Sequence, residues 1–290
     1  MIQLPPIHLK EFLKNKGLSS TAYKTLKAAK SVWINNKEIT GDQLLFPGDI
    51  VTFNFPEQES SIFAQKGPLD IIFEDDYLIV VNKPAGILIH PTTKNAENSL
   101  ANFVAGYYLE KNIKAGIHPV SRLDKNTSGL VVFAKKSYIQ AALSKESMQK
   151  EYLGLVLGHP NEDIGDIIAP IERKPGSIIE RQVSENAGKY AKTSFTVLEK
   201  YKTISLVQFI LTTGRTHQIR VHAAFIGHPL LGDNLYGSKG PQSRHFLHAS
   251  KITFKHPVTG EVMVISCKMP QDMEEAISKD KNNQEENNML

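Results

Sequence analysis

The sequence is poor in cysteine and in long apolar runs. Its only cysteine, Cys267, cannot form an internal disulfide, and we expect it to be a buried strand residue. No stretch approaches the roughly 18 consecutive apolar residues of a membrane-spanning helix, and the N-terminal MIQLPPIHLKEF lacks the basic and then apolar plan of a signal peptide. We therefore expect a cytoplasmic protein with no membrane contact. Its 41% hydrophobic and 22% charged residues predict a packed globular core.

Common motifs for nucleotide, metal and serine chemistry are also missing. No P-loop, GxGxxG or GxSxG segment occurs, which argues against nucleotide hydrolysis, dinucleotide cofactors and a hydrolase nucleophile elbow. His245 and His248 stand three residues apart without an acidic partner, and the spacing of five between His217 and His222 does not stack ligands on one helix face. We expect neither a cofactor nor a metal site.

The charge that is present lies unevenly along the chain. Residues 1–55 carry seven lysines and four acidic residues, whereas the tail from Gln271 carries two lysines and six acidic residues. The net charge is therefore +3 in the first segment, −4 in the tail and +5 in the remainder. Positive charge on both folded parts suits a polyanionic partner such as RNA, although an ordinary solvated surface can have the same composition.

Residues 1–55 predict a small unit of two helices and a sheet. The stretches HLKEFLKN and TAYKTLKAAK each place apolar residues on one helix face. In VWINNKEI, Asn35 and Asn36 can adopt the left-handed backbone of a tight hairpin, and the alternating IVTFNF follows as a strand. The polar, proline-bounded PEQESSIFAQKGP then predicts a linker over residues 56–69.

Residues 70–270 predict a larger domain. DIIFEDDYLIVVNKP indicates two strands around an acidic turn, and further β-rich segments are KEYLGLVLG, KTSFTVLEKY, ISLVQFILTT and KITFKHP. Helices are expected through NSLANFVAGYYLE and SYIQAALSKESM. The predicted fold class is mixed α/β (α+β) with a largely antiparallel sheet, followed by a frayed polar tail over residues 271–290.

The segment HPVSRLDKNTSGLVVFAK holds the first candidate for chemistry. Asp124 lies between Arg122 and Lys125 and precedes a turn-forming NTSG and the apolar strand LVVFA. A carboxylate on a loop at a strand entrance is accessible to a ligand, and neighbouring cations favour its charged form. Asp124 is therefore a candidate nucleophile or base. A turn aspartate with a surface ion pair is the ordinary alternative.

A second dense cluster is TTGRTHQIRVHAAFIGHPLLGDNLYG. Arg215 follows a glycine at the end of a predicted strand, and a predicted helix carries His217, Arg220 and His222. Arg215 can offer a planar, bidentate partner to a carboxylate or a phosphate. The histidines are as readily explained as ordinary core or surface imidazoles.

At these residues the sequence resembles the large-ribosomal-type (RluA-like) family of pseudouridine synthases, over nearly the whole catalytic domain. VVNKPAGILIHP resembles the family's first motif, RLDKNTSGL its catalytic motif, KEYLGLV its tyrosine-bearing motif and TGRTHQIRVH its last. HPLLGDNLYG and FKHPVTGE also resemble family segments. The resemblance implies an intramolecular transferase that isomerises uridine in RNA to pseudouridine, without redox change, cofactor or metal.

Carried over residue by residue, the resemblance makes Asp124 the essential aspartate and Tyr152 the aromatic residue that stacks on the target base. Arg215 becomes the ion-pair partner of Asp124. Ser121 departs from the family, which usually has histidine before the Arg-Leu-Asp. The expected substrate-binding residues are Arg122, Lys150, Lys83 and His90.

Residues 1–55 more loosely resemble the S4 RNA-binding domain that often precedes this catalytic domain. Ser20 and Thr21 stand where that domain commonly has arginine, and Asn36 stands where glycine is common. Because phosphate contacts need surface lysine or arginine, the expected RNA-binding residues are Lys24, Lys27 and Lys30. A unit that only covers the core is the alternative.

Two other functions stay open on the residues alone. A non-catalytic RNA-binding or ribosome-assembly protein would tolerate loss of Asp124. A hydrolase of glycosidic bonds would usually need a second carboxylate, and none is evident beside Asp124. The synthase is favoured because four motifs occur in the expected order. Ribosomal RNA is the expected partner, with transfer RNA as the alternative, and we expect a monomer.

Overall fold

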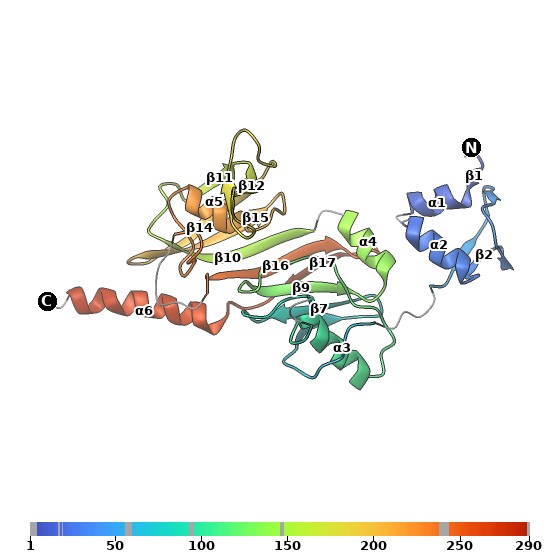
Figure 1. The fold of residues 1–290 in the computed structure, drawn as a ribbon, viewed down its shortest axis with the longest axis horizontal. Helices are drawn as coiled ribbons and strands as arrows, with labels where there is room; N and C mark the ends of the chain where they lie inside the picture. Colours follow the sequence, from blue (N-terminus) through green and yellow to red (C-terminus); the bar gives the residue numbers. More distant parts are fainter. Residues whose placement is uncertain are drawn as a thin grey trace.

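The structure is a computed structural model that describes residues 5–16, 18, 20–55, 60–92, 96–145, 148–237 and 244–288. Figure 1 shows an elongated molecule, with a small N-terminal unit at one end of its long axis and the last helix at the other. A twisted sheet fills the body between them. Within the described residues, no helix is both long and apolar enough to cross a bilayer.

The N-terminal unit packs two helices against small sheets, as the sequence predicts. Leu9, Leu13 and Leu26 are buried in its core. Asn35 and Asn36 have φ angles of 49° and 65°, the left-handed backbone expected at the hairpin. Two sheets form, β1–β4 and β3–β2–β5. The elements are β1 (Ile7–His8), α1 (Leu9–Asn15), α2 (Ser20–Ala28), β2 (Val32–Ile34), β3 (Lys37–Glu38), β4 (Leu44–Leu45) and β5 (Val51–Phe53).

The body is built on a ten-stranded sheet in the order β11-β14-β15-β10-β16-β9-β7-β6, with β17 beside β16 and β8 beside β9. Only the β16–β9 pair is parallel among these neighbours, so the predicted mixed fold with a largely antiparallel sheet is confirmed. The strands are β6 (Asp70–Glu74), β7 (Leu78–Lys83), β8 (His118–Pro119), β9 (Ser128–Ala134), β10 (Gln149–Leu157), β11 (Ile164–Ile168), β14 (Lys192–Lys200), β15 (Ile204–Leu211), β16 (Leu247–Lys255) and β17 (Val262–Ser266).

Four helices and a separate hairpin cover this sheet: α3 (Leu100–Glu110), α4 (Ser137–Lys145), α5 (Gln218–Phe225), α6 (Gln271–Asn288), and β12 (Ile171–Arg173) paired with β13 (Arg181–Val183). In β7, Ile79 and Val81 pack in the cluster that holds α3, whereas Leu78 and Val80 pack in the cluster that holds α4. A strand covered on both faces is apolar at successive positions, which explains the unbroken LIVV.

The two halves of the sheet meet where β9 runs beside β16. This parallel pairing is short, with Ser128 opposite His248 and Gly129 opposite Ala249. Gly129 has a φ of 114°, and a Cβ atom there would lie 2.3 Å from the Ala249 carbonyl oxygen. Only glycine tolerates both the backbone angle and the close approach. The glycine after Asn-Thr-Ser therefore permits the junction, and Asp124 lies just before it.

The last helix corrects the predicted frayed tail. Met273 and Ile277, four residues apart, are buried against Leu155 and Ile204 on the sheet face opposite α5. The Asp280 carboxylate accepts hydrogen bonds from the backbone and hydroxyl of Thr203. The acidic, amide-rich composition concealed this spacing, so the expectation of a frayed tail is wrong for the start of α6.

Part of the predicted linker also lies on the body. Ile62, Ala64 and Leu69 pack against the core beneath α3. The side-chain amide of Asn102 in α3 donates to the Phe63 carbonyl oxygen at 2.8 Å. Residues 56–59 lie outside the described residues, so the structure leaves that part of the linker prediction as a prediction.

Candidate active site

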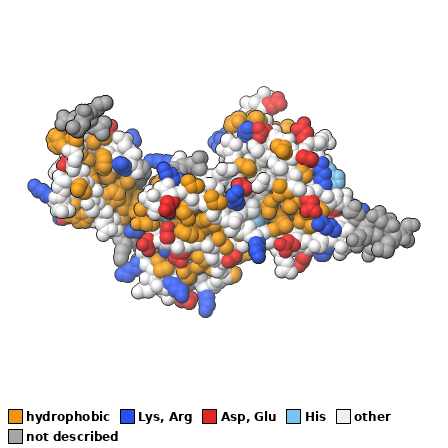
Figure 2. Space-filling view, turned by 180° about the vertical axis from the view of Figure 1, so that it is seen from behind, with side chains coloured by type: hydrophobic (Ala, Val, Ile, Leu, Met, Phe, Trp, Pro, Cys, Tyr) orange, Lys and Arg blue, Asp and Glu red, His pale blue; other side chains and the backbone are white. Residues whose placement is uncertain are grey.

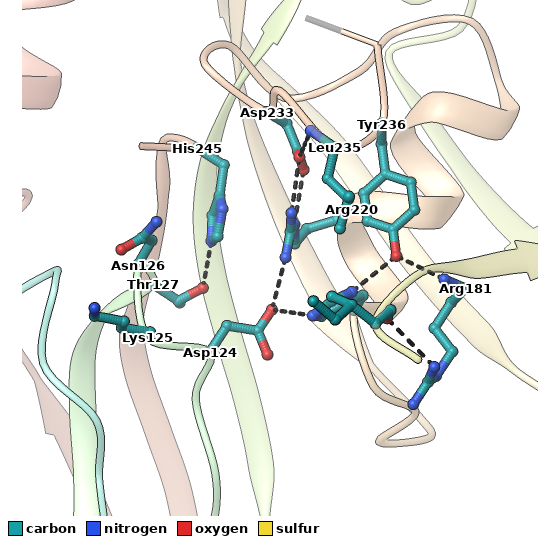
Figure 3. Close-up of polar contacts among 12 residues, drawn as sticks. Asp124, Lys125, Asn126, Thr127, Arg181, Arg220, Asp233, Leu235, Tyr236 and His245 are labelled. Carbon is teal, nitrogen blue, oxygen red and sulfur yellow. Dashed lines mark hydrogen bonds and ion pairs between the residues drawn. The ribbon is translucent and has the colours of Figure 1, made fainter. Parts of the chain in front are cut away.

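The loop that carries Asp124 is fixed from behind by buried polar groups. A turn closes between the Thr127 amide and the Asp124 carbonyl oxygen at 3.1 Å. The Thr127 hydroxyl lies 2.8 Å from Nε2 of His245, a contact drawn in Figure 3. Arg244 donates to the Asn126 carbonyl oxygen at 3.4 Å while its guanidinium is paired with Asp272 at the start of α6. The loop before β9 is thus tied to the segment that leads into β16 and, through Arg244, to α6.

Lys83 supports the same loop from β7. Its side chain is fully buried, and Nζ donates to the carbonyl oxygens of Pro84, Ile87 and Lys125 at 2.9–3.0 Å. Burial, with the nearby charge of Arg244, lowers the pKa of Lys83 to about 7, and Asp124 opposes this shift. Lys83 was predicted to bind substrate, but its ammonium group is engaged with backbone oxygens under the loop.

The Asp124 carboxylate faces two side chains from the start of α5. Arg220 Nη1 lies 3.3 Å from Asp124 Oδ2, and His217 Nε2 lies 3.6 Å from the same oxygen. Arg220 is held in turn by Asp233, which accepts from Nε and Nη2 at 2.8 Å each. Figure 3 shows this chain from Asp233 through Arg220 to Asp124. Asp233 is 1% exposed, so the arginine is clamped by a buried carboxylate.

The predicted ion pair between Arg215 and Asp124 is wrong. Arg215 lies in the exposed loop before α5, and its Nε donates to the Tyr190 carbonyl oxygen at 3.0 Å. Arg220 takes the predicted role because it lies within α5, on the side turned into the body. The sequence placed both arginines in one motif, but the helix begins between them at Gln218.

A cavity of about 290 Å³ opens in front of Asp124. Its lining brings together several residues that the sequence singled out: Asp124, Tyr152, Arg215, Arg122 and Lys150. Tyr152 is 5% exposed and lies on β10 where the pairing with β16 shifts register past Ser250. Such bulges re-aim side chains beside sites. Burial, with the charge of Asp124, raises the pKa of Tyr152, so its phenol keeps its proton.

The remaining predicted substrate residues differ in position. Arg122 is exposed at the cavity, and Lys150 is half-buried there, with a pKa lowered by burial. Ser121, at the position where the resembled family usually has histidine, also lines the cavity. His90 is exposed in the loop between β7 and α3 and is absent from that lining.

His245 and His248 have structural roles where β9 meets β16. His248 lies 3.0 Å from the Ser128 hydroxyl and 3.2 Å from Cys267 Sγ. Burial lowers the pKa of both His245 and His248 to about 4, with a further contribution from nearby arginines. Cys267 is half-buried and lies one residue past β17, so the prediction of a buried strand residue is wrong on both burial and strand. Among the described residues, no group of three or more metal-ligating side chains is found.

Comparison with known proteins identifies the family. A family model described as RNA pseudouridylate synthase matches residues 77–225, about half of the chain. The chain belongs to the RNA pseudouridylate synthases. These enzymes isomerise uridine in RNA to pseudouridine. The match spans the Asp124 loop, Tyr152 and the start of α5, so the family match and the cavity coincide.

Relatives of this synthase align with two thirds or more of it. It is 35% identical to the uncharacterized RNA pseudouridine synthase YjbO of Bacillus subtilis over 93% of this chain and 98% of that one. It is 38% identical to the ribosomal large subunit pseudouridine synthase D of Nitrosomonas europaea, over 84% and 75% of the two chains. Human RNA pseudouridylate synthase domain containing 1 superposes with a TM-score of 0.59 at 25% identity, covering 69% and 83%.

Sequence reasoning missed the roles of Asp233 and Tyr236. Both lie in the segment HPLLGDNLYG, but neither spacing nor composition links that segment to Asp124. Their contacts with Arg220 of α5 and with His217 before it span 13 and 19 residues of sequence. The only signal in the sequence was an acidic residue with glycine before it and a tyrosine three residues later, which is equally typical of a surface turn.

Proposed function

We propose that this synthase isomerises specific uridines of ribosomal RNA, with Asp124 as the catalytic carboxylate. The observation that carries the proposal is the Asp124 carboxylate at the cavity wall, 3.3 Å from the guanidinium of Arg220. Relatives named as large-subunit ribosomal synthases favour ribosomal RNA over transfer RNA.

The reaction uses an anionic carboxylate in its first step. The bond from ribose to N1 breaks, the base turns while bound, the ribose joins C5, and the proton that leaves C5 is balanced by one gained at N1. Asp124 either attacks the ribose anomeric carbon or removes a proton from the adjacent ribose carbon. Both routes use the charged form, which the positive charge of Arg220 stabilises.

The cavity suits a nucleotide that has left its helix. Extruding a base costs on the order of a few kcal/mol, and stacking on an aromatic ring is worth about 1–3 kcal/mol. We assign this stacking to Tyr152, which shares the cavity with Asp124. Arg122, Lys150 and Arg215 lie around the same opening and would contact the flanking phosphates.

The lining argues against a glycosidic hydrolase. Among the described residues that line this cavity, Asp124 is the only carboxylate. Asp233 is near, but Arg220 occupies both of its oxygens. Hydrolysis of a glycosidic bond usually uses two carboxyl groups on opposite sides of the bond. An isomerase that keeps the base bound needs only one.

The N-terminal unit is proposed to bind RNA outside the cavity. Lys24, Lys27 and Lys30 are all exposed on or just after α2. On the face seen in Figure 2, basic side chains lie among acidic and apolar ones and do not merge into one patch. We therefore expect these lysines to add affinity through phosphates, while the cavity selects the uridine.

Pseudouridine mapping across total RNA tests the proposal. Cells carrying the wild-type protein, no protein, or Asp124→Ala are compared at nucleotide resolution. A ribosomal site lost in both the deletion and the Asp124→Ala cells supports catalysis and names the substrate. A site lost only in the deletion would contradict the role of Asp124. Loss confined to a transfer RNA site would overturn the choice of ribosomal RNA.

A further inference from the structure

The two side chains that face Asp124 are both held by one segment after α5. Asp233 clamps Arg220 through both of its carboxylate oxygens. Tyr236, three residues later, contacts the other one: its hydroxyl lies 2.8 Å from His217 Nδ1. The Tyr236 ring also lies beneath the Arg220 guanidinium, 5.0 Å from its centre. Figure 3 shows Tyr236 and Asp233 on the far side of Arg220 from Asp124.

The hydrogen bonds of Tyr236 have a defined direction. The backbone N–H of Arg181 in β13 donates to the Tyr236 hydroxyl oxygen at 2.9 Å. The phenol has one hydrogen of its own, and His217 Nδ1 is the acceptor in reach. Burial raises the pKa of Tyr236, so the phenol keeps that hydrogen. A phenol that donates to Nδ1 leaves the imidazole proton on Nε2.

The other side of His217 favours the same arrangement. Nε2 lies 3.6 Å from the Asp124 carboxylate, which repels a lone pair and attracts an N–H. His217 has a positive φ of 59° and precedes α5, a backbone that turns the ring between Tyr236 and Asp124. Burial lowers the pKa of His217; Arg220 and Arg181 add to this, while Asp124 and Asp233 oppose it. The ring is therefore neutral near pH 7, with a single proton to place.

We propose that Tyr236 is a positioning residue that fixes His217 as the Nε2–H tautomer, so that this N–H points at Asp124. The proposal rests on the proposed role of Asp124. With Arg220 and the His217 N–H both facing Oδ2, the carboxylate is held in one orientation at the cavity wall. Without the Tyr236 hydroxyl, the proton is free to move to Nδ1, and a lone pair then faces Asp124.

The Arg181 amide links the Tyr236–His217 contact to the β12–β13 hairpin beside the cavity. Arg181 begins β13, and Ile179 just before it lines a second hollow that also contains Asp124 and His217. Ile179 is 59% exposed, and its neighbour Ile178 is 83% exposed. The loop end of the hairpin therefore holds the phenol through the Arg181 amide and borders the approach to Asp124 through Ile179.

The test combines nuclear magnetic resonance with kinetics on the full-length protein. Histidine labelled with ¹⁵N reports the tautomer of His217, whose signals are assigned by their loss in His217→Gln. Tyr236→Phe removes only the hydroxyl. The matched control is Tyr201→Phe, because the Tyr201 hydroxyl contacts Glu199 on β14. Turnover is measured with total RNA from cells that lack the protein.

The expected wild-type spectrum shows a protonated Nε2 and an unprotonated Nδ1. Tyr236→Phe should mix or reverse these signals and lower kcat by up to about 100-fold, the scale of a misplaced catalytic group, with an unchanged KM. Tyr201→Phe should change neither. An Nδ1–H tautomer in the wild type, or a Tyr236→Phe protein with the wild-type tautomer and kcat, would overturn the proposal.

Two further results separate this inference from the proposed function. If Asp124→Asn retained full turnover, the catalytic role of Asp124 would fail whatever the tautomer. If Tyr236→Phe failed to fold, as judged by its thermal transition, the wild-type spectrum alone would still decide the tautomer. A merely structural role for Tyr236 would lower stability without moving the imidazole proton.

Discussion

The Asp124 loop and the N-terminal unit are attached to the same sheet in opposite ways. The loop is held by Lys83 of β7, by the contact of its own Thr127 with His245, and by Arg244, which pairs with Asp272 of α6. The N-terminal unit meets the body where Phe55 stacks on Tyr138 of α4, with ring centroids 4.1 Å apart. Figure 1 shows the unit set apart at the end of the molecule.

This difference suits the Asp124 loop to catalysis and the N-terminal unit to RNA affinity. A carboxylate that must meet one ribose carbon needs a rigid support, because small displacements cost rate. A unit that contacts phosphates needs exposed charge and tolerates motion. We therefore expect changes behind the Asp124 loop to alter kcat and stability, and changes in the N-terminal unit to alter KM.

The largest effect is expected from Lys83→Met. Removing Nζ takes a donor from the carbonyl oxygens of Pro84 and Ile87; Pro84 is exposed and its oxygen can bond to water, whereas a buried group left unsatisfied costs about 1–3 kcal/mol. Urea denaturation should show a loss of about 1–3 kcal/mol in the free energy of unfolding, and kcat should fall because the Lys125 carbonyl is released. Lys111→Met, at an exposed lysine after α3, is the control. Equal stability in the two variants would contradict the role given to Lys83.

The second largest effect is expected from acid, which should lower the free energy of unfolding through His248 at the β9–β16 junction. The pKa of His248 is about 4 in the folded protein, below its ordinary value of 6.5, so the unfolded chain binds the proton first. Neutral His248 therefore leaves the free energy of unfolding at its full value above pH 6.5. As pH falls toward 4, that free energy decreases by up to about 3 kcal/mol. Unfolding free energies at several pH values should show a weaker pH dependence in His248→Gln. The exposed-site variant His8→Gln should follow the wild type.

A smaller, purely affinity-based effect is expected in the N-terminal unit. The triple variant Lys24→Gln, Lys27→Gln, Lys30→Gln should raise KM for RNA several-fold and leave kcat unchanged. The slope of log affinity against log salt should fall by about 0.7–0.9 for each phosphate that the variant no longer neutralises. An unchanged salt slope would mean that these lysines do not touch RNA and that the unit only covers the body.

The smallest effect is expected from Tyr138→Ala. Removing the stacked pair should lower stability by about 0.5–1.5 kcal/mol beyond the effect of the reduced buried area. Small-angle X-ray scattering should then show a broader range of positions for the N-terminal unit, with kcat unchanged. A large fall in kcat would show that the unit positions Asp124, and the contrast between the loop and the unit would fail.

The sequence predicted the strands, hairpin and helices whose patterns lie within a few neighbouring residues. The continuous LIVV and LVVF segments, the Asn35–Asn36 hairpin and the apolar helix faces all carry their periodicity in a few neighbouring residues. The first half of α6 was also encoded, by Met273 and Ile277 four residues apart, but polar neighbours masked it.

Within the candidate site, the residues at the cavity were predicted and their partners were not. Asp124, Tyr152 and Arg122 lie in motifs that resemblance could transfer. Which arginine reaches Asp124 depends on where α5 begins, and the clamp on Arg220 depends on a fold that returns Asp233 to it. Such pairings arise from tertiary packing, which spacing along one chain does not encode.

Release of tritium from RNA labelled at C5 of uridine is the most direct test of the catalytic role of Asp124. Labelled total RNA from cells without the protein is incubated with purified wild type or Asp124→Asn, a change that keeps the shape of the side chain and removes its charge. We predict that both proteins bind RNA equally and that only the wild type releases tritium. Release by Asp124→Asn at the wild-type rate would contradict this role.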